Sequence, residues 1–145
     1  MHNASELVER LTDARAGKVL HPGGAGWSEV APLYAASGEP MMVIRPTDSL
    51  QVSIAVRFAA MESLELSVRS GGHLAMAFPN GGGLVIDLCE LRGIDVDGTR
   101  VGVGGGAVWG DVARELGRHG LALTSGDTKS VGVGGLSLGG GIGWM

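Results

Sequence analysis

Apolar and polar positions in the first 45 residues predict a helix, a loop and a strand. Apolar residues at helical spacing indicate a short helix over residues 4–14. Residues 21–40 contain several glycines and prolines and no regular period, so we expect a loop there. Residues 41–44 are all apolar and predict a short strand, which Pro46 ends.

A second helix and a second strand follow directly. Thr47 is the expected cap of a helix over residues 48–61, whose apolar side chains extend around much of its circumference, so this helix should be well buried. Residues 64–68 alternate between apolar and polar side chains, as strands do. A strand, a helix and a strand in such a short stretch favour a parallel pair with a right-handed crossover.

The remaining elements are predicted by similar patterns. Residues 84–88 form an apolar strand, and residues 94–103 contain an Asp-Gly turn between two strands, which is typical of a hairpin. Residues 107–119 have the period of an amphipathic helix, and Gly120 is placed to stop it. Residues 121–123 predict a further short strand.

Glycine is unusually frequent, with 27 of the 145 residues. Only five glycines lie in residues 1–70, and the others form clusters in residues 71–145 between stretches of Val, Leu and Ile. Collagen is excluded because no Gly-X-Y period is present, and the apolar residues argue against a flexible linker. The clusters indicate either tight turns or a ligand that lies directly against the backbone.

Composition and charge exclude several classes of protein. The chain is 44% hydrophobic and 18% charged, as in a globular domain, and its net charge of −4 provides no basic excess for nucleic acid. The longest apolar runs are about five residues, far from the ~20 of a membrane-spanning helix. We see no signal peptide and expect a cytoplasmic protein. A single cysteine excludes internal disulfides.

Two nucleotide-binding motifs match only in part. Residues 102–107 fit the G-x-G-x-x-A pattern of dinucleotide-binding folds, with Asp127 about 20 residues further on, but a hairpin precedes them where the motif requires the first strand of a βαβ unit. Residues 128–130 resemble the end of a phosphate-binding loop but lack the glycine before Lys129. A nicotinamide-binding fold is therefore disfavoured.

His73 is the strongest candidate for chemistry. It follows two glycines where a predicted strand ends, and Arg69 lies four residues before it, so free peptide N–H groups and a cation are close together. No second ligand stands at metal-binding spacing, and we expect no metal here. Cys89 follows an apolar strand and is interpreted as a packed thiol. Asp127 fits an anion site, a helix cap or a plain turn.

These residues resemble the PCMH-type FAD-binding domain of the vanillyl-alcohol-oxidase type, and within it the berberine-bridge-enzyme-like FAD-linked oxidoreductases. The most specific motif is Arg-Ser-Gly-Gly-His at residues 69–73. Four segments appear in the order of the family, namely 45–48, 68–73, 84–88 with 101–112, and 120–143.

The resemblance implies an α+β fold of two small α/β subdomains, one with a short parallel βαβ sheet and one with a mixed or antiparallel sheet, incomplete at the C-terminus. Residues 1–40 would be an N-terminal helix and loop, and residues 41–145 the FAD-binding domain. FAD would lie between the subdomains. The cofactor-binding residues implied are Arg69, Ser70, Gly71, Gly72, His73, Leu74, Gly126, Asp127, Val131, Gly132, Gly134, Gly135, Gly139, Gly140 and Gly141.

The resemblance also implies a covalent bond between His73 and the benzenoid-ring methyl of the flavin, formed by a neutral imidazole. Some relatives have a second bond to a cysteine, but Thr128 stands at that position, and a hydroxyl is a far poorer nucleophile than a thiolate, so we expect one bond. Residues 74–79 depart from the pattern of the family, which alters the contacts with FAD after His73.

The implied reaction is hydride transfer from a C–H bond of a small-molecule substrate to flavin N5, followed by reoxidation by O₂ or another acceptor. In the family, a substrate domain beyond these residues supplies the catalytic base, so no catalytic residue is assigned here. Two alternatives remain open: a truncated, non-catalytic remnant or FAD-binding module, and a dehydrogenase that binds FAD without a covalent bond.

Overall fold

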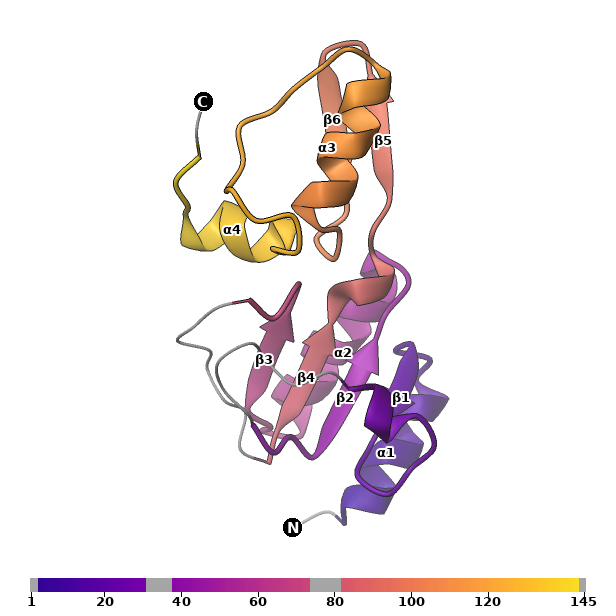
Figure 1. The fold of residues 1–145 in the computed structure, drawn as a ribbon. Helices are drawn as coiled ribbons and strands as arrows, with labels where there is room; N and C mark the ends of the chain where they lie inside the picture. Colours follow the sequence, from indigo (N-terminus) through magenta and orange to yellow (C-terminus); the bar gives the residue numbers. More distant parts are fainter. Residues whose placement is uncertain (1–2, 31–37, 74–81, 144–145) are drawn as a thin grey trace.

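The computed structural model describes residues 3–30, 38–73 and 82–143, which form two lobes (Figure 1). The first lobe, up to residue 91, contains a four-stranded sheet, two helices and two short 3₁₀ helices. Its elements are α1 (Ala4–Asp13), β1 (Lys18–Leu20), η1 (Trp27–Glu29), β2 (Met42–Arg45), α2 (Ser49–Met61), β3 (Leu66–Arg69), β4 (Leu84–Asp87) and η2 (Leu88–Glu90).

The strands of this sheet lie in the order β1-β2-β4-β3. Both β2 and β3 are parallel to β4, whose Leu84 pairs in register with Met42 and with Leu66. The predicted parallel orientation of these two strands is confirmed, but β2 and β3 do not pair with each other, because β4, whose first three residues are apolar, lies between them. Strand β1, which the sequence patterns missed, pairs antiparallel with β2.

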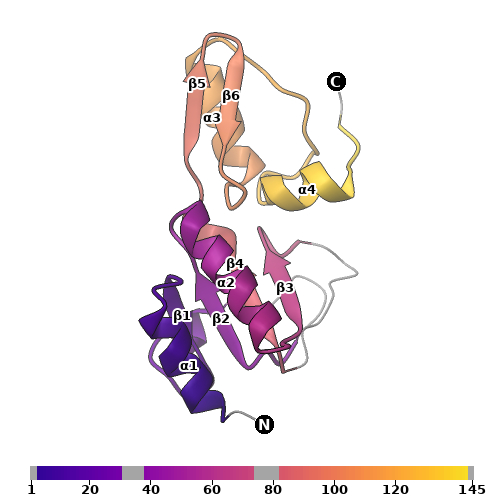
Figure 2. The ribbon, with the colours of Figure 1, turned by 180° about the vertical axis from the view of Figure 1, so that it is seen from behind.

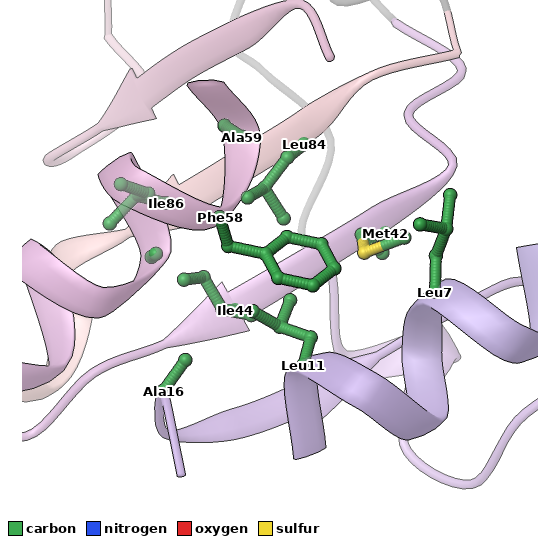
Figure 3. Packing of buried hydrophobic residues seen from close by; sticks show 10 residues of the cluster. Leu7, Leu11, Ala16, Met42, Ile44, Phe58, Ala59, Leu84 and Ile86 are labelled. Atoms are coloured by element: carbon green, nitrogen blue, oxygen red, sulfur yellow. The ribbon is translucent and has the colours of Figure 1, made fainter. Parts of the chain in front are cut away.

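The core of the first lobe lies between the sheet and its two helices. Leu11 of α1, Phe58 of α2 and Ile44 of β2 point toward one another in Figure 3 and are at most 3% exposed. Helix α2 lies along one face of the sheet (Figure 2), so its outer side faces solvent. Leu50 and Met61 are 68% and 73% exposed, so the predicted burial of this helix holds only for the side that packs on the core.

Asp48, not Thr47, caps helix α2. Its side-chain oxygen accepts the backbone N–H of Gln51 at 2.8 Å, and the side chain of Gln51 in turn accepts the backbone N–H of Thr47 at 2.8 Å. This exchange resembles a capping box, and it satisfies two backbone donors at the start of the helix. The cap therefore moves by one residue from the predicted position.

The second lobe begins after residue 91 and has a smaller core. Its elements are β5 (Ile94–Asp97), β6 (Arg100–Val103), α3 (Trp109–Arg118) and α4 (Val133–Gly139). The hairpin β5–β6 pairs antiparallel, and Trp109, Val112 and Leu116 of α3 pack against it. The predicted hairpin and helix are confirmed, and Gly120 adopts a φ of +66° just after the helix.

One prediction for the second lobe was wrong, and one helix was missed. Residues 121–123 have no regular secondary structure. Helix α4 forms inside the glycine-rich stretch, where no helix was predicted, and the buried Val133 joins it to the core beneath α3. The two sheets with their helices confirm the predicted α+β class. Among the described residues, none of the helices combines the length and apolarity needed to cross a membrane.

Candidate flavin site

Three parallel strands bring charged residues to one edge of the first lobe. Arg45, Arg69 and Asp87 are the last residues of β2, β3 and β4, and parallel strands end at the same edge of a sheet. One carboxylate oxygen of Asp87 accepts a hydrogen bond from Arg45 Nε at 3.0 Å and another from Arg69 Nη2. Its second oxygen faces the backbone N–H of Cys89 at 3.3 Å.

Burial and charge act in opposite directions on Asp87, which is 1% exposed. Burial alone would raise the pKa of this carboxyl, but the hydrogen bonds and positive charge of Arg69, with a further hydrogen bond from Arg45, lower its pKa below the ordinary value. Asp87 is therefore ionised at neutral pH. For Cys89, burial and the nearby charge of Asp87 raise the pKa, so this residue stays a thiol.

The loop after β3 touches the second lobe. The hydroxyl of Ser70 donates to the carbonyl of Gly105 at 2.5 Å. A Cβ built on Gly71 would lie 2.5 Å from the backbone nitrogen of Gly132, and a Cβ on Gly132 would overlap Gly71 and the Ser70 hydroxyl. We call this contact between residues 70–71 and residues 105 and 132 the seam. Side chains at either glycine would force the two lobes apart.

A pocket of about 320 Å³ lies beside the seam and has walls from both lobes. Its lining contains three arginines and two aspartates together with several glycines that expose their peptide groups. The lining residues are Arg45, Arg69, Ser70, Gly71, Gly72, Asp87, Cys89, Arg92, Gly106, Ala107, Val108 and Asp111. This combination of guanidinium groups and bare peptide suits a phosphate-bearing ligand.

Some glycine clusters serve the packing of the chain itself. Cβ atoms on Gly104 and Gly106 would overlap the carbonyl groups of Leu91 and Leu88 at the crossing between the lobes. The first backbone N–H group of α3 also has a partner within the chain, because the N–H of Trp109 donates to the carbonyl of Val131 at 3.0 Å. Close packing of backbone therefore accounts for glycine at these positions, although Gly106 also lines the pocket.

Four of the predicted site residues before residue 74 line the pocket, and His73 is not among its lining residues. Arg69 and the following Ser-Gly-Gly line it, and His73, which is partly buried, comes next along the chain. Leu74 lies outside the described residues.

The second predicted group is spread along the approach to α4 and over the helix itself. Gly132 touches Gly71 at the seam, and the backbone N–H of Gly134 donates to the carbonyl of Gly105 at 3.3 Å. Val131 accepts from Trp109, and Asp127 accepts the Thr128 hydroxyl at 2.9 Å. Glycines 126 and 141 approach the side chain of Leu136, whereas glycines 135, 139 and 140 have open space where a Cβ would stand.

Several lining residues were missed by reasoning from the sequence. Asp87 ends an apolar strand and gives no local sign that two arginines meet it. Asp111 was interpreted as part of a solvated helix face, but it lines the pocket while its side chain, 46% exposed, pairs with Arg114 at 2.7 Å. Arg92 lies in the crossing between the lobes. The role of Asp87 could not be predicted without the strand order, which places Arg45 and Arg69 on the two strands that flank β4.

Comparison with known proteins identifies related chains. Residues 40–145 match the family described as the FAD binding domain. (R)-6-hydroxynicotine oxidase of Paenarthrobacter nicotinovorans is 36% identical over 134 residues, which are 89% of this chain and 29% of that protein. The chain thus spans less than a third of the length of this relative.

Solved structures agree with this match. The crystal structure of 6-hydroxy-D-nicotine oxidase from Arthrobacter nicotinovorans superposes with a TM-score of 0.83 at 36% identity, over 88% of this chain and 29% of that one. Glucooligosaccharide oxidase from Acremonium strictum, described with a 6-S-cysteinyl, 8α-N1-histidyl FAD, gives a TM-score of 0.84 at 25% identity, over 94% of this chain and 30% of that one. This chain belongs to the FAD-binding domain family, and its cofactor is FAD.

Proposed function

We propose that the chain holds FAD along the pocket between the lobes, through residues 69–74 and 126–141, and serves as the flavin-binding part of an oxidase. The observation that carries this proposal is the seam, where the Arg-Ser-Gly-Gly loop and the glycine-rich approach to α4 meet beside a pocket. Both segments are those assigned to FAD by the resemblance, and they are distant in sequence.

The pocket fits part of such a cofactor. Its volume of about 320 Å³ is at the lower end of the usual range of ~300–1,000 Å³ for ligand sites, so it would take one section of an extended dinucleotide. The guanidinium groups of Arg69 and Arg45 and the peptide groups of residues 70–72 suit the negative pyrophosphate.

The bound flavin would supply the two-electron acceptor, taking a hydride from a C–H bond of a small-molecule substrate at N5 before O₂ is reduced. The part of this chain in that reaction is to bind the cofactor, orient it and tune its affinity for electrons. Residues that contact the substrate are expected in the part of the relatives that this chain does not match. A cytoplasmic location remains a prediction.

His73 is proposed as the covalent attachment point. It directly follows Gly72, which lines the pocket, in the loop assigned to FAD by the resemblance. The imidazole of His73 would hold the flavin through a bond from a ring nitrogen to the methyl carbon, in place of one N–H and one C–H, and O₂ would be the oxidant that takes up the two electrons and two protons as H₂O₂. One bond is expected, because Thr128 occupies the position of the second nucleophile and the raised pKa of Cys89 keeps its sulfur protonated.

The covalent bond is tested by precipitating the protein with acid and observing whether the yellow flavin stays with the precipitate. Wild-type protein should yield a yellow precipitate, and a protease digest should carry the flavin on the His73 peptide alone. His73→Ala should give a colourless precipitate, whereas the surface variant His119→Ala should stay yellow. A colourless wild-type precipitate with flavin in the supernatant would favour the dehydrogenase without a covalent bond.

A second measurement separates a flavin-binding chain from a non-catalytic remnant. Adding FAD to flavin-free His73→Ala protein at 100 times the dissociation constant should raise the unfolding free energy by about 2.7 kcal/mol, because the ligand binds only the folded state. Unchanged thermal stability over a wide range of FAD concentration would support the remnant.

A further inference from the structure

We infer that Asp87 is a positioning residue, which holds Arg69 and thereby sets the direction in which residues 70–73 leave strand β3. The inference rests on the proposed function, since residues 70–73 matter only if they hold the flavin. Asp87 and Arg69 are register partners at the ends of neighbouring parallel strands, and their side chains form an ion pair.

The carboxylate of Asp87, at the end of β4, connects this strand end to those of β2 and β3. One oxygen of Asp87 lies between Arg45 of β2 and Arg69 of β3, and the other faces the backbone of η2, which starts the crossing to the second lobe. The side chains of both arginines are 12% exposed and that of Asp87 is 1% exposed. Without the carboxylate, two nearly buried cations would face each other.

Stability is a weak reason to place such a cluster here. Desolvation offsets much of the attraction within a buried ion pair, so apolar side chains can serve a core as well or better. The orientation of the loop is the stronger reason. Asp87 holds the guanidinium of Arg69 by an ion pair, and the next residue, Ser70, is hydrogen-bonded to Gly105 across the seam. The loop is thus held at its base by Asp87 and in its middle by the seam.

The change in charge and the loss of positioning predict opposite effects of Asp87→Asn on the affinity for FAD. Removing the carboxylate makes the pocket more positive by one charge, which by Coulomb attraction alone would tighten the binding of an anionic cofactor. Loss of positioning would weaken binding. The sign of the change in the dissociation constant of FAD therefore decides between the two.

The experiment measures FAD binding to flavin-free protein in the His73→Ala background, where binding is reversible, by quenching of flavin fluorescence. Asp87→Asn should raise the dissociation constant at least about tenfold, the equivalent of one charge-assisted hydrogen bond. Arg69→Gln should weaken binding as well, and the double variant should be no weaker than Arg69→Gln alone, because Asp87 acts through Arg69.

The matched control is Glu62→Gln. Glu62 is also a nearly buried carboxylate, 6% exposed, paired with an arginine, Arg10, but it lies at the end of α2 away from the pocket. This variant should lose stability, but its dissociation constant for FAD should stay within about twofold of that of the parent protein. A change of about twofold is too small to represent the loss of a charge-assisted hydrogen bond.

The outcomes separate the two levels of the hypothesis. If His73→Ala protein with Asp87 intact binds no FAD, the proposed function fails. If that protein binds FAD and Asp87→Asn binds it equally well or more tightly, the positioning role is overturned. Should Asp87→Asn fail to fold, Arg69→Lys replaces it: this variant keeps the charge but loses the planar fork, and an unchanged affinity would equally refute the inference.

Discussion

At the scale of single residues, Asp87 shows how a local feature acquires its meaning from its neighbours. It ends an apolar strand and is almost completely buried. Such a carboxylate stays ionised only if cations compensate the lost hydration, and Arg45 and Arg69 do so from the flanking strands. The pKa of Asp87 is lowered because these two arginines stabilise its charged form more than burial destabilises it.

The stability difference between wild-type protein and Asp87→Asn should depend on pH. Because the folded pKa of Asp87 lies below the ordinary value of ~3.9, its contribution is complete above that value and is lost as the pH falls through it toward the folded pKa. We expect a difference of about 3–5 kcal/mol at pH 7 that shrinks progressively below pH ~4. Urea denaturation of both proteins across this range provides the measurement. A difference that stays constant with pH would contradict the assigned ionisation.

At the scale of elements, helix α2 positions two of the three strand ends. It connects β2 to β3 across one face of the sheet, so its length and its packing determine where β3 lies (Figure 2). Phe58 and Ala59 anchor the helix in the core, and the Asp48 cap defines its first turn. Loss of that cap should therefore weaken the lobe without touching the pocket.

Asp48→Ala should lower the free energy of unfolding by about 1 kcal/mol, because the backbone N–H of Gln51 loses its acceptor. Asp48→Asn offers the same acceptor oxygen and should stay close to wild type. Guanidinium denaturation of the three proteins is the measurement. Equal losses in both variants would show that the charge of Asp48, rather than its hydrogen bond, stabilises the helix.

At the scale of the whole molecule, the pocket exists because two lobes dock at a seam of bare backbone. The chain passes from β4 into the second lobe (Figure 1) through η2. The contacts of Ser70 and Gly71 with residues 105 and 132 join the two lobes a second time. Since the pocket walls come from both lobes, any change that separates the lobes should also open the pocket.

Gly71→Ala should disturb the docking of the lobes, because its Cβ would lie 2.5 Å from a backbone atom of Gly132 that has no flexible side chain to yield. We expect a loss of about 1–3 kcal/mol in stability, as for other overpacked sites, together with weaker FAD binding. Thermal unfolding and flavin fluorescence provide the two measurements.

Gly117→Ala in α3 is the matched control for Gly71→Ala. A Cβ at Gly117 meets no atom within 4 Å, so this variant should be neutral or stabilised by up to about 1 kcal/mol through the better helix propensity of alanine. If the two variants behave alike, the close approach at the seam does not restrain the lobes.

Local patterns predicted most of the elements. The strands at residues 42–45, 66–69 and 84–87, the hairpin and the helices α1, α2 and α3 have clear periods of apolar residues, and the structure confirms them within a few residues. Strand β1 and helix α4 were missed because they are short. The three residues of β1 pair with β2, and the seven of α4 are anchored by Val133, so both depend on partners elsewhere in the chain.

The sequence by itself determined the backbone chemistry of the site: the Arg-Ser-Gly-Gly-His loop, the later glycine clusters and, through the resemblance, the family and its cofactor. Only the tertiary structure decided that β4 enters between β2 and β3, that Asp87 therefore meets both arginines, and that Gly71 touches Gly132. The physical reason is that periodicity and turn preference act between near neighbours along the chain, whereas strand order and lobe docking depend on contacts between distant residues that form only when the complete fold packs.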